Sequence, residues 1–289
     1  MIHNIKRGQR MKVKILSDTT CDLSEELLKK YNIDTMPFPV ILGDKQYLDG
    51  VTVTPKDIIE YNQTNKDFPK TTAPNMSEYM DFFSKFLDGN TEIVFIGLSS
   101  ELSSCFNNMK LAAGELKNVY FVDSKSLSTG TGLLVIKAAE MAQNGKTAEE
   151  IVSEIEKLVP FVQASFVVEK LDYLRKGGRC SMLAALGANL LKIKPMLLLK
   201  NGKIVKEKTF FGKHTEVLKK YVDYVFEKFP NYDKSRIFVT HTMSRDEYID
   251  AVKQCLKDKG FEEILETNAG ATVTCHCGPN TIGILYISK

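Results

Sequence analysis

Glu92–Asn108, with the sequence EIVFIGLSSELSSCFNN, combines a strand, a serine-rich turn and the start of a helix. Its first seven residues are mostly β-branched, aromatic or apolar, as expected of a buried parallel strand. Apolar residues then recur at helical spacing from Met109 to Leu116, and Ser103 or Ser104 is placed to cap that helix. A strand end, a cluster of hydroxyls and a helix N-terminus therefore meet at one point, which is where open α/β sheets bind ligands.

This turn is a candidate site for an acid group or a phosphate, at Ser99, Ser100 and Ser103, because exposed amides, hydroxyls and a helix N-terminus all favour an anion. The alternative is that the serines only cap the helix. A hydrolase nucleophile elbow is excluded, since it needs Gly-x-Ser-x-Gly and Ser99 is followed by Ser100-Glu101. Two further predicted strands, 12–16 and 119–122, also end in polar residues, so polar side chains gather at one edge of the predicted sheet.

The composition is that of an ordinary globular protein of 289 residues, 43% hydrophobic and 26% charged. The net charge is only +3 and the lysines are scattered, so the electrostatic footprint of a nucleic-acid-binding protein is missing. No apolar run is long enough to span a bilayer, and no signal peptide follows the first basic residues. Six cysteines without a signal peptide predict reduced thiols and a cytoplasmic location.

The order of the predicted elements indicates an α/β protein with two α/β domains, the first with a mainly parallel sheet and the second with a mixed sheet. Residues 1–10 are expected to be a disordered leader, 11–163 the N-terminal domain with the hydroxyl loops, and 164–289 the C-terminal domain. In the first domain, 32–42 predicts one strand with an irregular approach, and Gly130 and Gly132 in a mostly apolar helix over 128–144 are expected to permit close packing. In the second, 171–188 predicts a helical region interrupted at Gly177-Gly178, and Asn201-Gly202 predicts a β-hairpin.

Six stretches together resemble the DegV family of fatty-acid-binding proteins and occur in that family's order. They are Ser17–Thr20, Thr71–Pro74, Leu98–Ser103, Leu171–Arg179, Leu191–Pro195 and His276–Pro279. The resemblance extends from Lys12 to Lys289. It implies that a long-chain fatty acid is buried between the two domains.

The resemblance also implies the residues that bind the carboxylate of the fatty acid: Thr71, Thr72, and Ser99 or Ser100, with His276 close by. The residues themselves leave the choice between the two serines open. Hydroxyls and amides match a carboxylate without an arginine, whose permanent charge would oppose release. By the same resemblance the protein is a lipid carrier without a metal or a cofactor, and it presents the fatty acid to a separate ATP-dependent kinase.

Four basic residues are expected to face such a kinase: Arg175, Lys176, Arg179 and Lys213. The alternative is a solvated run of charges, in which Gly177 and Gly178 impose a backbone constraint near the domain junction. Phe210 and Phe211 occupy a stretch where the family tends to be basic, so the sequence departs from the family's pattern at a position expected to meet the kinase.

The alternative function is a small-molecule enzyme that uses Ser or His chemistry in the cleft between the domains. The missing nucleophile elbow, P-loop and dinucleotide fingerprint argue against it. Cys275-His276-Cys277 is a weak metal candidate, because adjacent side chains cannot easily all face one ion. His241 follows a predicted strand and is either a core histidine or a group near the site.

Overall fold

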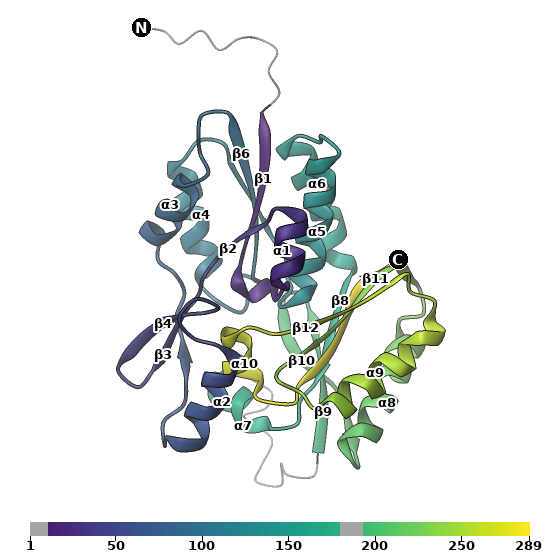
Figure 1. Cartoon of the computed structure of the whole chain (residues 1–289). Helices are drawn as coiled ribbons and strands as arrows, with labels where there is room; N and C mark the ends of the chain where they lie inside the picture. The colour runs from purple at the N-terminus through teal and green to yellow at the C-terminus, as the bar shows by residue number, and fades with distance from the viewer. Residues whose placement is uncertain (1–10, 180–192) are drawn as a thin grey trace, which may run out of the picture.

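The first sheet has four parallel strands in the order β2-β1-β6-β7 (Figure 1) in the computed structural model, which describes residues 11–179 and 193–289. These strands are β1 (Lys12–Asp18), β2 (Asp34–Met36), β6 (Thr91–Gly97) and β7 (Val119–Asp123). On one face, Leu16, Ile93 and Phe95 pack against α3 (Met76–Ser84) and α4 (Cys105–Glu115). The opposite face packs against α1 (Glu25–Tyr31), α5 (Thr129–Gln143) and α6 (Ala148–Leu158). The parallel sheet predicted for the first part of the chain is confirmed.

The second sheet has six strands in the order β10-β9-β8-β13-β11-β12. They are β8 (Val162–Val167), β9 (Ile193–Lys200), β10 (Lys203–Phe211), β11 (Tyr232–His241), β12 (Glu263–Asn268) and β13 (Ile282–Ser288). β11 and β12 run parallel and the other neighbours antiparallel, which confirms the predicted mixed sheet. The predicted hairpin joins β9 to β10, with Asn201 and Gly202 both at positive φ. α8 (His214–Lys228) and α9 (Asp246–Leu256) pack on this sheet.

The prediction of one strand over 32–42 is wrong. The chain breaks between β2, which belongs to the first sheet, and β3 (Pro39–Leu42), which pairs antiparallel with β4 (Lys45–Leu48) and β5 (Lys70–Thr71). Pro37 and Pro39 explain the break, because proline has no N–H to donate to a continuous ladder. The third, small sheet holds Thr71 at the end of β5. α2 (Pro55–Thr64) follows β4 and begins with a capping box between Thr54 and Asp57.

α5 joins the two sheets into one core. Its buried Leu133 and Leu134 belong to a cluster that includes strands of both sheets. A Cβ on Gly130 would lie 3.3 Å from the Cβ of Ala164 on β8, and one on Gly132 would lie 2.8 Å from the carbonyl oxygen of Cys21. The close packing predicted for these two glycines is therefore confirmed.

Two short helices complete the described chain, α7 (Leu171–Gly177) and α10 (Ala271–Cys277). α10 was not predicted from the sequence. Figure 1 shows it in yellow beside α2 and β3, and its Ala271 and Cys275 pack with Val40, Val53 and Ile58. A helix from the end of the chain thus completes the packing of the N-terminal part.

Two sequence-based expectations lie outside the described residues, the leader at 1–10 and the second half of the helical region predicted over 171–188. In the part of the chain that the structure describes, no helix combines the length and the apolar character needed to cross a membrane.

Candidate functional site

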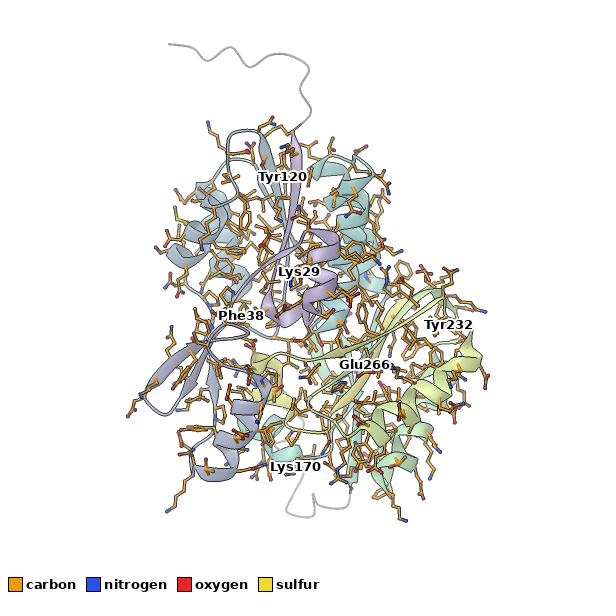
Figure 2. All side chains as sticks on the ribbon, in the orientation of Figure 1. Lys29, Phe38, Tyr120, Lys170, Tyr232 and Glu266 are labelled. Carbon is orange, nitrogen blue, oxygen red and sulfur yellow. The ribbon has the colours of Figure 1, made fainter. Side chains whose placement is uncertain are left out.

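A cavity lies where the polar ends of β1 and β6 meet the small sheet and α10. The volume in it that water can occupy is about 70 Å³. Apolar side chains form most of its wall: Phe38, Leu98, Leu102, Leu127, Leu174 and Ile204. Phe38, which follows β2, is labelled in Figure 2 at the junction of the first and the small sheets. The wall therefore suits an apolar ligand.

Polar groups on this wall come from β5, from α10, from the short 3-10 helix after β1 and from loops. They are Thr20, Thr71, Thr72, Ser103, Thr272, His276 and Arg179. Thr71 Oγ1 lies 2.9 Å from His276 Nε2, across a sequence separation of 205 residues. The sequence-based residues Thr71, Thr72 and His276 are thus brought together.

The other ring nitrogen of His276 is buried. Nδ1 has no hydrogen-bond partner among the described residues. A Cβ on Gly177 would lie only 2.4 Å from it, so the absence of a side chain at Gly177 makes room for the imidazole. Gly178 then ends α7 with φ +69°, a left-handed conformation that glycine adopts without strain. The backbone constraint predicted for this pair of glycines is confirmed.

Burial and, to a smaller extent, the nearby positive charge of Arg179 together lower the pKa of His276 from 6.5 to about 4. The imidazole is therefore neutral at pH 7. A neutral ring has one N–H donor and one acceptor nitrogen. It can accept the hydroxyl hydrogen of Thr71, or donate to Thr71 and leave that hydroxyl free for an anion.

Arg179 lies at the mouth of this cavity. Its Nη1 donates to the carbonyl oxygen of Gly177 at 2.7 Å, and its Nε lies 3.5 Å from the carbonyl oxygen of Leu102. Hydroxyls and amides are therefore not the only polar groups at this cavity, because the turn at Gly178 places Arg179 on its wall. Gly177-Gly178-Arg179, where the predicted helical region is interrupted, was the sequence signal for the position of the Arg179 guanidinium.

The serine turn reaches the cavity through Ser103, whereas Ser99 and Ser100 do not line it. The buried Ser99 Oγ donates to the carbonyl oxygen of Gly202 at 2.9 Å. Ser100 Oγ accepts a hydrogen bond of 2.8 Å from Lys125 Nζ. Both hydroxyls are engaged away from the cavity, and the hydroxyl of Ser99 joins the turn to the tip of the β9–β10 hairpin. Ser103 also accepts a hydrogen bond from the backbone N–H of Cys105 at the start of α4.

The predicted docking residues fall into two places. Arg175 and Lys176 are exposed on α7, where Arg175 lies 3.6 Å from Asp172 and the Lys176 ammonium lies 3.7 Å from the centroid of the Phe68 ring. Lys213 is exposed just before α8, no residue of which lines the cavity. α7 itself contributes Leu174 to the cavity wall, so Arg175 and Lys176 lie closer to the site in the fold.

The two phenylalanines at the end of β10 differ in exposure. Phe210 is only 7% exposed and packs in the core of the second sheet, whereas Phe211 is 64% exposed. Phe211 is therefore available at the surface, and Phe210 is not.

A second, smaller cavity lies beside the first, toward the second sheet. The two share Leu127, Val273 and Cys277, and the second extends to Phe166 and Leu285. His241 is on its wall, with Nε2 3.5 Å from a carboxylate oxygen of Glu266. Burial lowers the pKa of His241. The two cavities thus lie on either side of Leu127, Val273 and Cys277, and the polar groups around Thr71 belong to the first.

The thiols near these cavities are protonated at neutral pH. Burial raises the pKa of Cys277 to about 12, and it also raises the pKa of Cys275. Neither is an activated nucleophile. Within residues 11–179 and 193–289, no three His, Cys, Asp or Glu side chains come together as metal ligands.

Comparison with known proteins gives one consistent result. The model of the DegV family of uncharacterised proteins matches residues 12–289. A DegV domain-containing protein from Clostridium acetobutylicum is 30% identical over 281 residues, which covers 96% of this chain and 99% of the relative. A fatty acid-binding protein from Thermotoga maritima is 29% identical over 280 residues, 94% of this chain and 96% of its own. Among solved structures, a fatty-acid-binding DegV family protein from Thermus thermophilus has a TM-score of 0.89 at 26% identity, and covers 96% of this chain and 100% of its own.

Proposed function

The chain belongs to the DegV family, and from this premise we propose that it binds a long-chain fatty acid in the cavity. The carboxylate binds at Thr71, Thr72, His276 and Arg179, and the acyl chain follows the apolar wall toward the second sheet. The names of the Thermotoga and Thermus relatives support the ligand class.

The observation that carries this proposal is the position of the Thr71–His276 pair and Arg179 together on a mostly apolar wall. A carboxylate accepts hydrogen bonds from a hydroxyl, a ring N–H and a guanidinium. An acyl chain is stabilised by about 0.8 kcal/mol for each CH₂ group removed from water. One polar end and a mostly apolar wall match the two parts of a fatty acid.

Within this proposal the protein is a carrier that presents its lipid to a separate ATP-dependent kinase. The carboxylate end lies under α7, so a kinase that reaches it must dock over Arg175, Lys176 and Arg179. Lys213 belongs to this surface if the contact extends to the start of α8.

The ligand is tested by mass spectrometry of the lipid extracted from purified protein, in which we expect a stoichiometric fatty acid. A matched pair of variants, Thr71→Ala and Thr71→Ser, then tests the site. Loss of the hydroxyl should cost about 1.5–3 kcal/mol, the range for a hydrogen bond to a charged group, which corresponds to a roughly 10- to 150-fold weaker affinity for palmitate. Thr71→Ser keeps the hydroxyl and should stay within a few-fold of the wild type. Equal affinities for all three folded proteins would refute this site.

The kinase contact is tested by Arg175→Glu, with Lys29→Glu on α1 as a control for charge reversal at an exposed helical lysine. Rim charges act mainly on the association rate. We expect Arg175→Glu to slow formation of acyl phosphate by the kinase from the same organism, most clearly at low salt, and to leave bound lipid unchanged. The same rate for Arg175→Glu, Lys29→Glu and the wild type at all salt concentrations would exclude this surface.

A further inference from the structure

α10 carries a large part of the cavity wall but lacks a capping side chain of its own. Thr272, Val273, His276 and Cys277 of this helix line the cavity. Its N-cap is Gly270, and no side chain at that position accepts a hydrogen bond from the first turn. The first amides of a helix have no partner within the helix and need an acceptor when they are buried.

Two carboxylates from the N-terminal part of the chain supply those acceptors. Asp49 Oδ1 accepts from the amide of Ala271 at 2.7 Å, and its Oδ2 accepts from the amide of Thr272 at 3.0 Å. Asp22 Oδ1 accepts from the amide of Gly270 at 2.7 Å. The hydrogen-bonded partners are 222 to 248 residues apart in the sequence.

The two aspartates and the N-terminus of α10 are closely packed against each other. Asp49 is 1% exposed and Asp22 6% exposed. A Cβ on Gly270 would lie 3.0 and 3.1 Å from the two carboxylate oxygens of Asp49, so a side chain there would press on the carboxylate. Among the described residues no lysine or arginine forms an ion pair with Asp22 or Asp49. The helix amides are thus the main partners of Asp49 and Asp22, together with hydroxyls from Thr19 and Ser128.

We propose that Asp49 and Asp22 are positioning residues for ligand binding: they fix the N-terminus of α10 on the first domain and so place His276 and Thr272 on the cavity wall. This inference rests on the proposed function for the identity of the ligand. His276 is on α10 and Thr71 is on β5. A small displacement of α10 relative to β5 would therefore move His276 Nε2 away from Thr71 Oγ1. Asp49 binds two amides and Asp22 one, so Asp49 has the larger effect.

The test compares Asp49→Asn with Glu150→Gln. In both variants a side-chain amide replaces a carboxylate that accepts a hydrogen bond from a backbone N–H at the start of a helix. Glu150 does this for Thr147 at the start of α6, no residue of which lines the cavity. Two quantities are measured for each delipidated protein: the NMR signal of the His276 ring, and the affinity for palmitate by calorimetry at a temperature where the protein is fully folded.

We expect Asp49→Asn to shift the His276 signal and to weaken palmitate binding at least tenfold. Glu150→Gln should leave the signal in place and the affinity within twofold of the wild type. An unshifted His276 signal in folded Asp49→Asn, or an equal loss of affinity in both variants, overturns the proposal. Asp22→Asn removes a single amide contact and should shift the signal in the same direction by less, so it serves as the test if Asp49→Asn does not fold. If the wild type itself binds no palmitate, the proposed function fails, whereas the His276 signal of the lipid-free variants still decides the positioning role.

Discussion

The titration of His276 makes the stability of the fold depend on pH in a way that can be calculated. Burial and, to a smaller extent, the positive charge of Arg179 lower its pKa from 6.5 to about 4. As the pH falls below 6.5, the unfolded chain binds a proton at this residue while the folded protein does not. The stability contributed by neutral His276 is therefore complete above pH 6.5 and is lost as the pH falls toward 4.

The size of the loss follows from the two pKa values. Between pH 7 and pH 4.5 the linkage relation gives about 2.4 kcal/mol. This is an upper value, because the ring is partly exposed toward the cavity and solvent there reduces the cost of its charge. His276→Gln cannot titrate and should lack this part of the acid destabilisation.

The assay is urea unfolding of the wild type and His276→Gln at pH 7.0, 5.5 and 4.5. The difference between the two proteins is the informative quantity, because other titrating groups contribute equally to both. Asp18 and Asp22, whose pKa values burial raises to about 6 and about 8, act in the opposite sense and stabilise the fold as the pH falls. If the wild type and His276→Gln lose the same free energy of unfolding between pH 7.0 and 4.5, the argument that His276 is held neutral by burial is refuted.

Three further variants test other parts of the structure. Ser99→Ala leaves the buried carbonyl oxygen of Gly202 without its donor and should lower the free energy of unfolding by about 1–3 kcal/mol, with palmitate affinity within about twofold of the wild type. An affinity loss as large as that of Thr71→Ala would instead assign Ser99 to the carboxylate site. Gly202→Ala puts a Cβ 2.5 Å from Ser99 Oγ at φ +82° and should cost more than about 1 kcal/mol in calorimetric unfolding; an unchanged melting temperature would contradict the contact. Leu134→Ala on α5 should cost about 2–5 kcal/mol while unfolding stays a single transition, since α5 belongs to one core with both sheets; two separate transitions would show independent cores.

Much of the local structure follows from short-range sequence signals. The capping box at Thr147 and Glu150, the proline at the start of α2 and the Asn201-Gly202 hairpin depend on neighbouring residues, and the structure contains each of them. The approach of Thr71 to His276 followed from matching family motifs, since no periodicity relates residues so far apart in the chain.

α10 shows what the sequence pattern could not supply. Ala271–Cys277 reads ATVTCHC, and its threonines and valine favour strands over helices. The residues that stabilise it as a helix, Asp22 and Asp49, lie more than 200 positions earlier. The hydrogen bond from Ser99 to Gly202 at the tip of the hairpin could not be predicted from local sequence either, because Gly202 reaches Ser99 only in the folded molecule. Tertiary contacts of this sort override local preferences.

The placement of α10 also constrains the order in which parts of the molecule can fold during synthesis. Val40, Val53 and Ile58 emerge from the ribosome well before the helix that covers them, which is encoded more than 200 positions later at residues 271–277. Until those residues leave the ribosome, this apolar surface lacks the cover of α10, and contacts at such sequence separation form slowly. We expect the nascent N-terminal part to stay incompletely folded and open to chaperones until α10 has been synthesised. The ligand cavity, which needs α10 for its wall, can form only after that point.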